Sequence, residues 1–597
     1  MSVAQLRSGD VDCEPDRRDP LFSTPREYPI SQPLHSSNNI SKRKTGVGSF
    51  KSHHATDTSS SMSDSESPPI ILTRPKTLYR HHTNASREIA LVDFLNDGYV
   101  QPENLSPEKK EAIARNYRPL SALSFAIILT ATWEYLMVAC TQGLINGGLA
   151  GLFWSYIWTC VGFTAPTSGG QFHWVSEFAP PEHQQFLSYV VGWMSTLSWQ
   201  AGNAADCFLT GTIAQALLVV NDPEYEPQRW HGTLFVFAMV CHRKTRQQKV
   251  TDGQIFLVYA LNTWGHDLWP RVQNGLMILH VLAFLAVVIT LWCLAPHRTP
   301  RDVFTKLTNN GGWSSTGLSL MVGQISAIYS ILGSDATAHM AEEVRDASRY
   351  VPISLFWSYF GNSIMAIVFL VSFLFAIDDV EAAVRHPTGY PFLYVFSNTL
   401  SPAGVNALTI IVLLLISAAN INFGASTARQ TFAFARDGGL PFSHWIARVS
   451  NTKKIPHNAI LLSSLIAALM AVINIGSTTA FYAIVSLQVV SLMFTYAVSL
   501  SCILHRRIAN PQSLPAARWS LGRWGVPVNI AGLVYVLFSF FWSFWPTLAQ
   551  FEARYFNWAG VLFGAVLLAC LASYRVQGRH VYRAPVKGVR KGVSEEG

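Results

Sequence analysis

The sequence predicts an all-α integral membrane protein with about twelve transmembrane helices. Three observations predict this class: an apolar composition, long apolar segments that recur along the chain, and basic residues gathered in alternate loops. Of the 597 residues 49% are hydrophobic and 13% are charged, which is about half of the charged fraction of roughly 25% in soluble proteins. The 8 cysteines are scattered singly, which excludes a disulfide scaffold. The net charge of +8 fits basic membrane loops better than a nucleic-acid partner.

Residues 1–118 form a polar segment rich in Ser, Pro, Arg, His and Asp, including a low-complexity run over 58–67. Such a segment buries too little apolar surface to offset its ordering entropy, so it predicts a disordered N-terminal tail. It has no charged region followed by an apolar one, so no cleavable signal peptide is predicted. This tail and the basic C-terminal tail, 576–597, are candidate contacts for trafficking or ubiquitin machinery.

Between the two tails, residues 119–575 form the predicted transmembrane domain. Crossing the hydrocarbon core takes about 20 apolar residues in a helix. The candidate spans are 120–143, 147–163, 187–218, 231–259, 272–295, 317–341, 351–377, 403–428, 458–475, 479–504, 526–547 and 557–574.

Basic residues predict the orientation of these spans. The loops 429–457 and 505–525 and the C-terminal tail carry most of the Lys and Arg, and two spans separate each from the next. The positive-inside rule makes their side cytoplasmic, with both termini there as well. The opposite loop at 378–381 is acidic.

Two spans are irregular. The second has about 17 residues before Pro166, enough for only about 25 Å of helix. The fourth is interrupted by the polar stretch 241–255, whose charges cannot cross lipid cheaply. One interpretation is an insertion into a single helix, and the other is a re-entrant polar loop between two half-spans.

Polar side chains within apolar spans are costly and therefore mark candidate functional positions. Small and polar residues interrupt spans 1 and 6, a pattern typical of the broken helices in transporters built from five-helix inverted repeats. Unwound backbone there can hold a carboxylate or a cation. The predicted substrate-binding residues are Thr130, Ala131, Thr132, Trp133 and Glu134 in span 1, Trp199, Gln200 and Asn203 in span 3, Gly333, Ser334, Asp335 and Ala336 in span 6, and Asn420 and Asn422 in span 8.

The chemistry of these residues suits a small amine. Glu134 and Asp335 are candidate counter-ions for an ammonium group, or one of them could take up a proton. Trp133 and Trp199 could add cation–π contacts worth about 0.5–2 kcal/mol. Purely structural roles remain open alternatives: hydrogen bonding within the bundle for Glu134, packing for the tryptophans, and bridging of helices for the asparagines. No motif predicts a metal or a cofactor.

The segment 165–175, Ala-Pro-Thr-Ser-Gly-Gly-Gln-Phe-His-Trp-Val, resembles the stretch after the second helix of the amino acid–polyamine–organocation superfamily, especially its fungal amino acid/choline/GABA permease branch. Further similar stretches, in order, are 133–134 with 146–148, 192–202, 333–352 and 428–441. The resemblance covers roughly 115–580. It implies a LeuT-type fold, a 5+5 inverted repeat with helices 1 and 6 broken. It also implies proton-coupled import of a small amine or amino acid, such as choline or GABA, across a fungal plasma membrane.

Three functional classes were weighed. A secondary active transporter is favoured, with substrate at the breaks of helices 1 and 6. A receptor or regulatory protein that keeps this fold without transporting is the alternative, prompted by the short second and interrupted fourth spans. ATP-driven transport is disfavoured because the sequence has no P-loop. A membrane enzyme is disfavoured because the sequence has no His-Glu-x-x-His or Gly-x-Ser-x-Gly motif and no convincing carboxylate dyad.

Overall fold

The computed structural model describes residues 115–163, 171–222, 224–237, 254–476, 478–514, 522–550, 552 and 556–585. All of them belong to one compact unit within residues 81–597. Several predictions lie wholly or largely outside the described residues: the N-terminal tail up to residue 114, the motif residues 165–170, residues 241–253 of the expected insertion, and the C-terminal tail from residue 586.

Apolar helices dominate the described chain, as the sequence predicts. Eight helices among the described residues are long and apolar enough to cross a membrane, and Gly148–Phe163, Thr316–Ile331 and His457–Ile473 are shorter apolar helices. The helices α9 and α10 stand where the interrupted fourth span was expected. The mean hydropathy of Trp269–Leu294 reaches 2.6, and exposed leucines and isoleucines on its surface suit contact with lipid.

The first half of the domain ends at the fifth span. Its elements are α3 (Pro119–Thr130), α4 (Thr132–Ala139), α5 (Thr141–Ile145), β1 (Asn146–Gly147), α6 (Gly148–Phe163), α7 (Gln171–Phe178), α8 (Gln184–Asn221), α9 (Arg229–Phe237), α10 (Gln254–Thr263) and α11 (Trp269–Leu294).

The second half and the last two spans follow. They comprise α12 (Pro300–Thr305), β2 (Thr308–Asn309), α13 (Thr316–Gly323), α14 (Ile325–Ile331), α15 (Ala336–His339), the 3₁₀ turn η1 (Ala341–Glu343), α16 (Ala347–Ala376), α17 (Val380–Val384), α18 (Pro391–Thr399), α19 (Pro402–Arg436), α20 (Ser443–Ile446), α21 (His457–Gly476), α22 (Thr478–Ala509), the 3₁₀ turns η2 (Pro511–Ser513) and η3 (Gly522–Trp524), α23 (Gly525–Trp542), α24 (Ala559–Ser573), the π-helical η4 (Tyr574–Gly578) and α25 (Arg579–Val581).

The predicted inverted-repeat fold with two broken helices is confirmed. The first helix of each half is interrupted near its middle, at Ala131 between α3 and α4 and at 332–335 between α14 and α15. The third helices of the two halves, α8 and α19, pack along each other, and α8 also packs along α22. The two breaks therefore belong to equivalent helices of the two halves.

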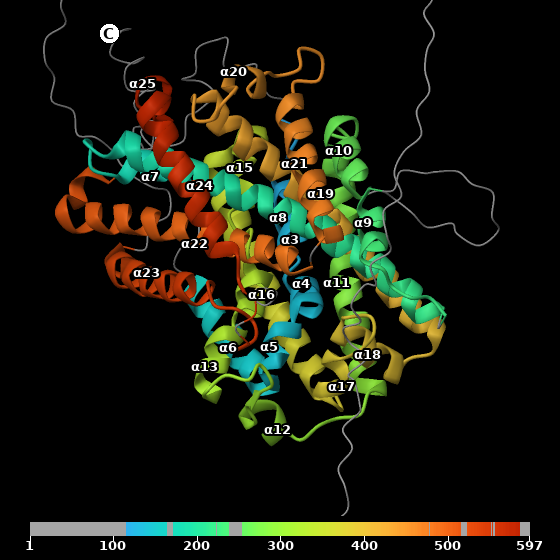
Figure 1. The fold of residues 1–597 in the computed structure, drawn as a ribbon. Coiled ribbons are helices and arrows are strands. Elements are labelled where there is room, and N and C mark those ends of the chain that lie inside the picture. The colour runs from blue at the N-terminus through green and yellow to red at the C-terminus, as the bar shows by residue number, and fades with distance from the viewer. Residues whose placement is uncertain are drawn as a thin grey trace, which may run out of the picture. The chain divides into compact units, whose positions relative to one another are not determined.

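The two ends of the helical domain are each held by backbone pairing. We call them the α20 end and the α12 end, after helices that lie on opposite sides of the domain (Figure 1). At the α20 end Tyr117, just before α3, forms a parallel bridge with Val344, just after η1. At the α12 end β1 pairs antiparallel with β2, Asn146 opposite Asn309. Each bridge joins the neighbourhood of helix 1 to that of helix 6.

Two loop regions differ from their expected form. The basic loop predicted from residue 429 begins later, because α19 continues to Arg436 and buries Arg429 inside the helix bundle. The start of the predicted C-terminal tail packs against the domain. The buried Tyr582 donates a hydrogen bond to Ser188 at 3.1 Å, and the backbone N–H of Arg583 donates to the carbonyl of Asp437 at 3.0 Å.

Candidate functional site

The break in helix 1 is a single residue in an unusual conformation. Ala131 has φ 32° and ψ 46°, in the left-handed region that non-glycine residues rarely adopt. Its N–H still closes the last turn of α3 on the carbonyl of Ile127, at 3.0 Å. Thr132 then begins α4, which no side chain caps. Because the first N–H groups of a helix have no partner within it, this buried helix start can receive an anion.

The break in helix 6 is longer and lies against the break in helix 1. Leu332 is extended and Gly333 has φ +84°, a conformation that glycine adopts without strain. A Cβ atom on Gly333 would meet the side chain of Leu129 of α3 at 2.9 Å, so α3 packs directly against the break in helix 6. The sequence pattern therefore predicted both breaks correctly.

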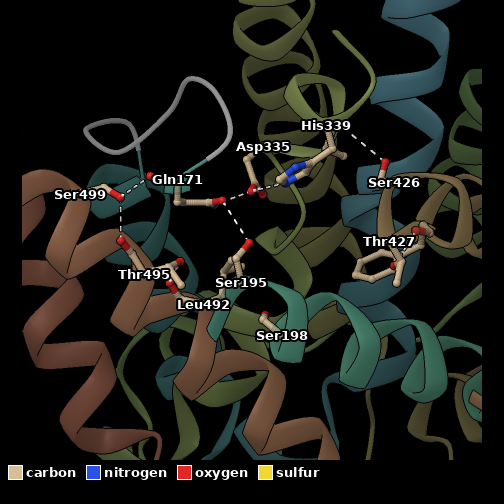
Figure 2. Close-up of polar contacts among 12 residues, drawn as sticks. Gln171, Ser195, Ser198, Asp335, His339, Ser426, Thr427, Leu492, Thr495 and Ser499 are labelled. Carbon is tan, nitrogen blue, oxygen red and sulfur yellow. Dashed lines mark hydrogen bonds and ion pairs between the residues drawn. The ribbon is translucent and has the colours of Figure 1, made fainter. Parts of the chain in front are cut away.

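Asp335 is the acidic group at the helix 6 break, and its side chain is 3% exposed. Its Oδ2 accepts hydrogen bonds from Gln171 Nε2 and from His339 Nε2, the latter at 3.1 Å (Figure 2). Gln171 in turn accepts from the Ser195 hydroxyl at 3.5 Å. Within the part of the chain that the structure describes, the second oxygen, Oδ1, is buried and accepts no hydrogen bond. Half of this carboxylate is thus held by the protein, and half can accept from a ligand.

Aromatic side chains lie beside this acid. The ring of Trp199 lies 4.8 Å from that of His339 and 4.5 Å from that of Phe423. The hydroxyl of Thr427 donates to the carbonyl of Trp199 at 3.1 Å and thereby holds α8 against α19. Trp199, predicted as a cation–π residue, therefore lies in the same cluster as the histidine that contacts Asp335.

The predicted residues on the other side of helix 1 form a second cluster. Glu134 Oε1 lies 2.6 Å from His280 Nδ1 of α11. Trp133 packs its ring against those of His280, Phe284 and Phe369, on α11 and α16. The hydroxyl of Thr130 accepts a hydrogen bond from Asn362 Nδ2. These contacts all lie among helices 1, 5 and 7, and none involves Asp335.

The remaining predicted residues are all buried, and several connect helices. Gln200 donates from α8 to Thr431 at 2.9 Å and to Ser463 at 2.8 Å. Asn422 accepts from Trp269 at 2.7 Å, and Ala336 offers its carbonyl to Ser426 at 3.4 Å. The buried remainder comprises Thr132, Asn203, Ser334 and Asn420, of which Asn203 Oδ1 and Asn420 Nδ2 have no hydrogen-bond partner.

Sequence reasoning missed four polar residues that the structure brings into these clusters. Gln171 and His339 hold Asp335, His280 pairs with Glu134, and Asp206 accepts from two tyrosines. A signal existed for three of them, because Asp206, His280 and His339 are ionisable residues inside the predicted spans. Gln171 lies in a loop motif and carried no such signal.

A small pocket adjoins the site on the side of the α20 end. It is lined by His339, Glu342, Glu343, Arg429, Phe432 and Ala433. Arg429 pairs with Glu343 at 2.7 Å, with both side chains buried, and Arg436 pairs with Glu342 at 2.8 Å. Burial would raise the pKa of Glu342, but the guanidinium of Arg436 outweighs it and holds that pKa below its ordinary value. Two ion pairs thus hold the wall of the pocket in place.

Comparison with known proteins supplies the family. The amino acid permease family model matches residues 120–567. The choline transporter of Saccharomyces cerevisiae is 25% identical over 452 residues, covering 73% of this chain and 77% of that protein. The amino-acid permease BAT1 of Arabidopsis thaliana is 26% identical, covering 84% and 98%.

A solved structure also aligns with much of the chain. The manganese transporter of Eremococcus coleocola aligns with 82% of this chain and 96% of its own, at 13% identity and a TM-score of 0.47. The family match covers most of the transmembrane domain, including both breaks. The chain is therefore a membrane transporter and not an enzyme, and it belongs to the amino acid permease family of the amino acid–polyamine–organocation superfamily.

Proposed function

We propose that this chain is a secondary active permease that imports a small amine or amino acid, such as choline or GABA, with a proton across the plasma membrane. The observation that carries the proposal is the close approach of the two helix breaks. Leu129 and Gly333 are near neighbours there, and one buried carboxylate oxygen of Asp335 has no hydrogen-bond partner among the described residues.

The two breaks offer complementary chemistry. Asp335 Oδ1 would accept from the ammonium group of the substrate, in a charge-assisted hydrogen bond of about 1.5–3 kcal/mol. The uncapped start of α4 would receive a substrate carboxylate, since helix N-termini attract anions. A zwitterion would use both groups. A quaternary amine such as choline would rely on the charge of Asp335 and the face of Trp199.

Alternating access requires the contacts that close each end of the domain to open. At the α20 end the Tyr117–Val344 bridge and the Arg429–Glu343 ion pair join helices 1, 6 and 8. At the α12 end the β1–β2 pair has the equivalent place. We infer that import breaks the contacts at the two ends in turn, with the site between them.

The α20 end is proposed to be cytoplasmic. The basic residues of the α19–α21 connection, Arg436, Arg448, Lys453 and Lys454, lie at this end, and those that follow α22 and α24 extend the same bias. Both chain termini would then also be cytoplasmic. The names of the relatives, a choline transporter and an amino-acid permease, support the substrate class but do not choose within it.

A non-transporting receptor of the same fold remains the second candidate, and the length of helix 2 favours it. The helix α6 has 16 residues, or about 24 Å at 1.5 Å per residue, against a hydrocarbon core of about 30 Å. A short helix can still span by local thinning of the bilayer. The two candidates differ in whether bound substrate crosses the membrane.

Uptake of labelled choline, GABA and neutral amino acids in permease-deficient yeast tests the proposal. We expect saturable uptake of at least one of them that rises as the external pH falls. Fluorescence microscopy of a tagged chain should place it at the cell surface. Binding of a substrate to the purified protein without any uptake would replace the permease with the receptor.

A further inference from the structure

Glu134 and His280 form an isolated pair of titratable groups deep in the helix bundle. Both side chains are 0% exposed, and Glu134 Oε1 lies 2.6 Å from His280 Nδ1. Glu134 lies in the first turn of α4, just after the helix 1 break, and His280 lies in the middle of α11. Among the described residues, no hydrogen bond or ring contact joins this pair to Asp335 or to its partners Gln171 and His339.

The tautomer of His280 follows from its other neighbour. His280 Nε2 lies 3.0 Å from Asn362 Oδ1. The amide nitrogen of Asn362 donates to the carbonyl of Ile127 at 3.0 Å and to the hydroxyl of Thr130. Because a backbone carbonyl can only accept, the orientation of the Asn362 amide is fixed, and its oxygen faces the ring. His280 Nε2 must therefore carry a hydrogen.

With Nε2 protonated, the short contact on the other side of the ring requires a second proton. Without one, the lone pair of Nδ1 and the carboxylate of Glu134 would face each other at 2.6 Å and repel. With this second proton present, the pair is a hydrogen-bonded unit with no net charge, whether Glu134 or His280 holds the proton. The geometry described here is therefore the proton-loaded form.

We propose that the Glu134–His280 pair is the binding site of the transported proton, an inference that rests on the proposed permease function. Loading places one proton between Nδ1 and Oε1, and unloading removes that proton to the opposite side of the membrane. No other bond is made or broken. Asn362 acts as a positioning residue, because it sets the tautomer without receiving the proton.

The pair is placed to sense the helix 1 break. Glu134 lies in the first turn of α4, while Asn362 holds Ile127 and Thr130 in the last turn of α3. Both contacts flank Ala131. Loss of the proton would replace an attraction by a repulsion on the α4 side alone, and so would favour movement of α4 relative to α3. Proton occupancy and the shape of the substrate site are thereby linked.

The surroundings favour a neutral pair. Trp133 packs against the ring of His280, and Phe284 and Phe369 pack against Trp133 in turn. Isolated charge beside this apolar cluster is expensive. On the elements packed against α4 and α11, the other titratable or charged groups are Tyr135 of α4, Arg271 and Cys293 of α11, Tyr329 of α14, Arg349, Tyr350 and Tyr359 of α16, Tyr394 of α18, and Arg429 and Arg436 of α19. Asp206 of α8 accepts hydrogen bonds from Tyr135 and Tyr329. Arg271 is nine residues from His280, about 14 Å along the helix.

Two measurements on the full chain in liposomes test the proposal. The first is pH-difference infrared spectroscopy, which follows the carboxyl band without any substrate. The second uses liposomes loaded with a pH dye, to which choline, GABA or alanine is added, with exchange of each radiolabelled probe followed in parallel. The variants are Glu134→Gln and His280→Gln, which keep a hydrogen bond but cannot exchange the proton. Glu381→Gln, an acid 63% exposed in a surface ion pair, is the matched control.

We expect a buried carboxyl band that Glu134→Gln removes and Glu381→Gln leaves. Both test variants should lose substrate-driven acidification, down to the leak of empty liposomes, and should keep measurable exchange whose rate no longer depends on pH. Acidification that persists in either variant would overturn the proposal, and so would loss of exchange, which would make the pair part of the fold or the substrate site. Should the wild-type chain exchange none of the probes, the permease function fails instead. In that case the infrared band alone tests whether the Glu134–His280 pair binds a proton.

Discussion

The carboxylate of Asp206 accepts a hydrogen bond from the hydroxyl of Tyr135 at 3.1 Å. Its other oxygen accepts one from Tyr329, also at 3.1 Å. Tyr135 lies on α4 and Tyr329 on α14, so a single buried acid of α8 ties together the halves of both broken helices that lead to the α12 end. Access to the site from that end requires these halves to separate from α8.

Replacement of either tyrosine hydroxyl should loosen this tie. A hydrogen bond to a charged group contributes about 1.5–3 kcal/mol, so Tyr135→Phe and Tyr329→Phe should each raise the open population roughly tenfold or more. Cys207, the buried neighbour of Asp206, is a native reporter of that opening. We expect faster maleimide labelling of Cys207, measured by mass spectrometry on the protein in liposomes.

Cys502 of α22 provides the internal control for this labelling. It is also buried, but it belongs to a different hydrophobic cluster from Tyr135. The labelling rate of Cys502 in both variants should match its rate in the unaltered protein. Equal rates of Cys207 labelling in the unaltered protein, Tyr135→Phe and Tyr329→Phe would show that the tyrosine contacts do not limit opening.

Removal of the charge of Asp335 should abolish uptake. Asp335→Asn keeps the shape of the side chain and a contact for Gln171 or His339, but takes away the counter-ion for an ammonium group. Loss of a charge-assisted hydrogen bond of about 1.5–3 kcal/mol would lower affinity roughly tenfold to a hundredfold. Uptake of labelled choline and GABA in permease-deficient yeast measures this loss.

The matched control for that variant is Asp267→Asn. Asp267 lies before α11 and is 78% exposed, with His266 at 3.3 Å. Its replacement should leave uptake unchanged, since exposed ion pairs contribute little. Unaltered kinetics in Asp335→Asn, with normal surface expression, would remove Asp335 from the substrate site.

The architecture was predictable because membrane insertion constrains composition directly. A span must be apolar for about 20 residues, and a break must bring polar or small residues into it. These requirements are visible at Gly333 and Asp335 and in the polar run around Ala131. The identity of Ala131 carries no preference for a left-handed conformation, so the polar context and not the residue itself revealed that break.

The pairing of side chains could not be predicted in the same way. Glu134 and His280 are 146 residues apart in sequence, and Gln171 and Asp335 are 164 apart. Membrane helices here are apolar around their whole circumference, so the sequence does not show which face turns inward. Trp133 and Trp199 therefore looked equivalent, yet one packs against α11 and α16 and the other lies beside His339.

The buried ion pair at the α20 end should be far more sensitive than a surface pair. Glu343→Gln leaves the guanidinium of Arg429 buried without its partner, at a cost of about 3–5 kcal/mol. Glu381→Gln breaks an exposed pair with Arg385, at about 0–1 kcal/mol. Thermal unfolding in one detergent compares the two, and we expect a clear fall in melting temperature for Glu343→Gln only. Similar melting temperatures would mean that water reaches Arg429 in the pocket and solvates it.

Close packing behind the aromatic cluster gives a further test, one that separates substrate affinity from folding. A Cβ atom on Gly202 of α8 would lie 2.5 Å from the ring of Phe423 and 2.7 Å from the amide of Gln488. Gly202→Ala must therefore displace the Phe423 ring, which packs against Trp199 at a tilt of 38°. Gly275→Ala on α11 meets nothing within 4 Å and is the matched control.

Displacement of Phe423 should weaken substrate binding more than it weakens the fold. An aromatic pair contributes about 0.5–1.5 kcal/mol, so the KM for uptake in Gly202→Ala should rise roughly two- to tenfold, while Gly275→Ala should leave KM unchanged. Surface expression of both variants, followed by fluorescence, separates a change in affinity from a loss of protein. An unchanged KM in Gly202→Ala would mean that Phe423 can move without disturbing Trp199, and that this aromatic cluster does not contact the substrate.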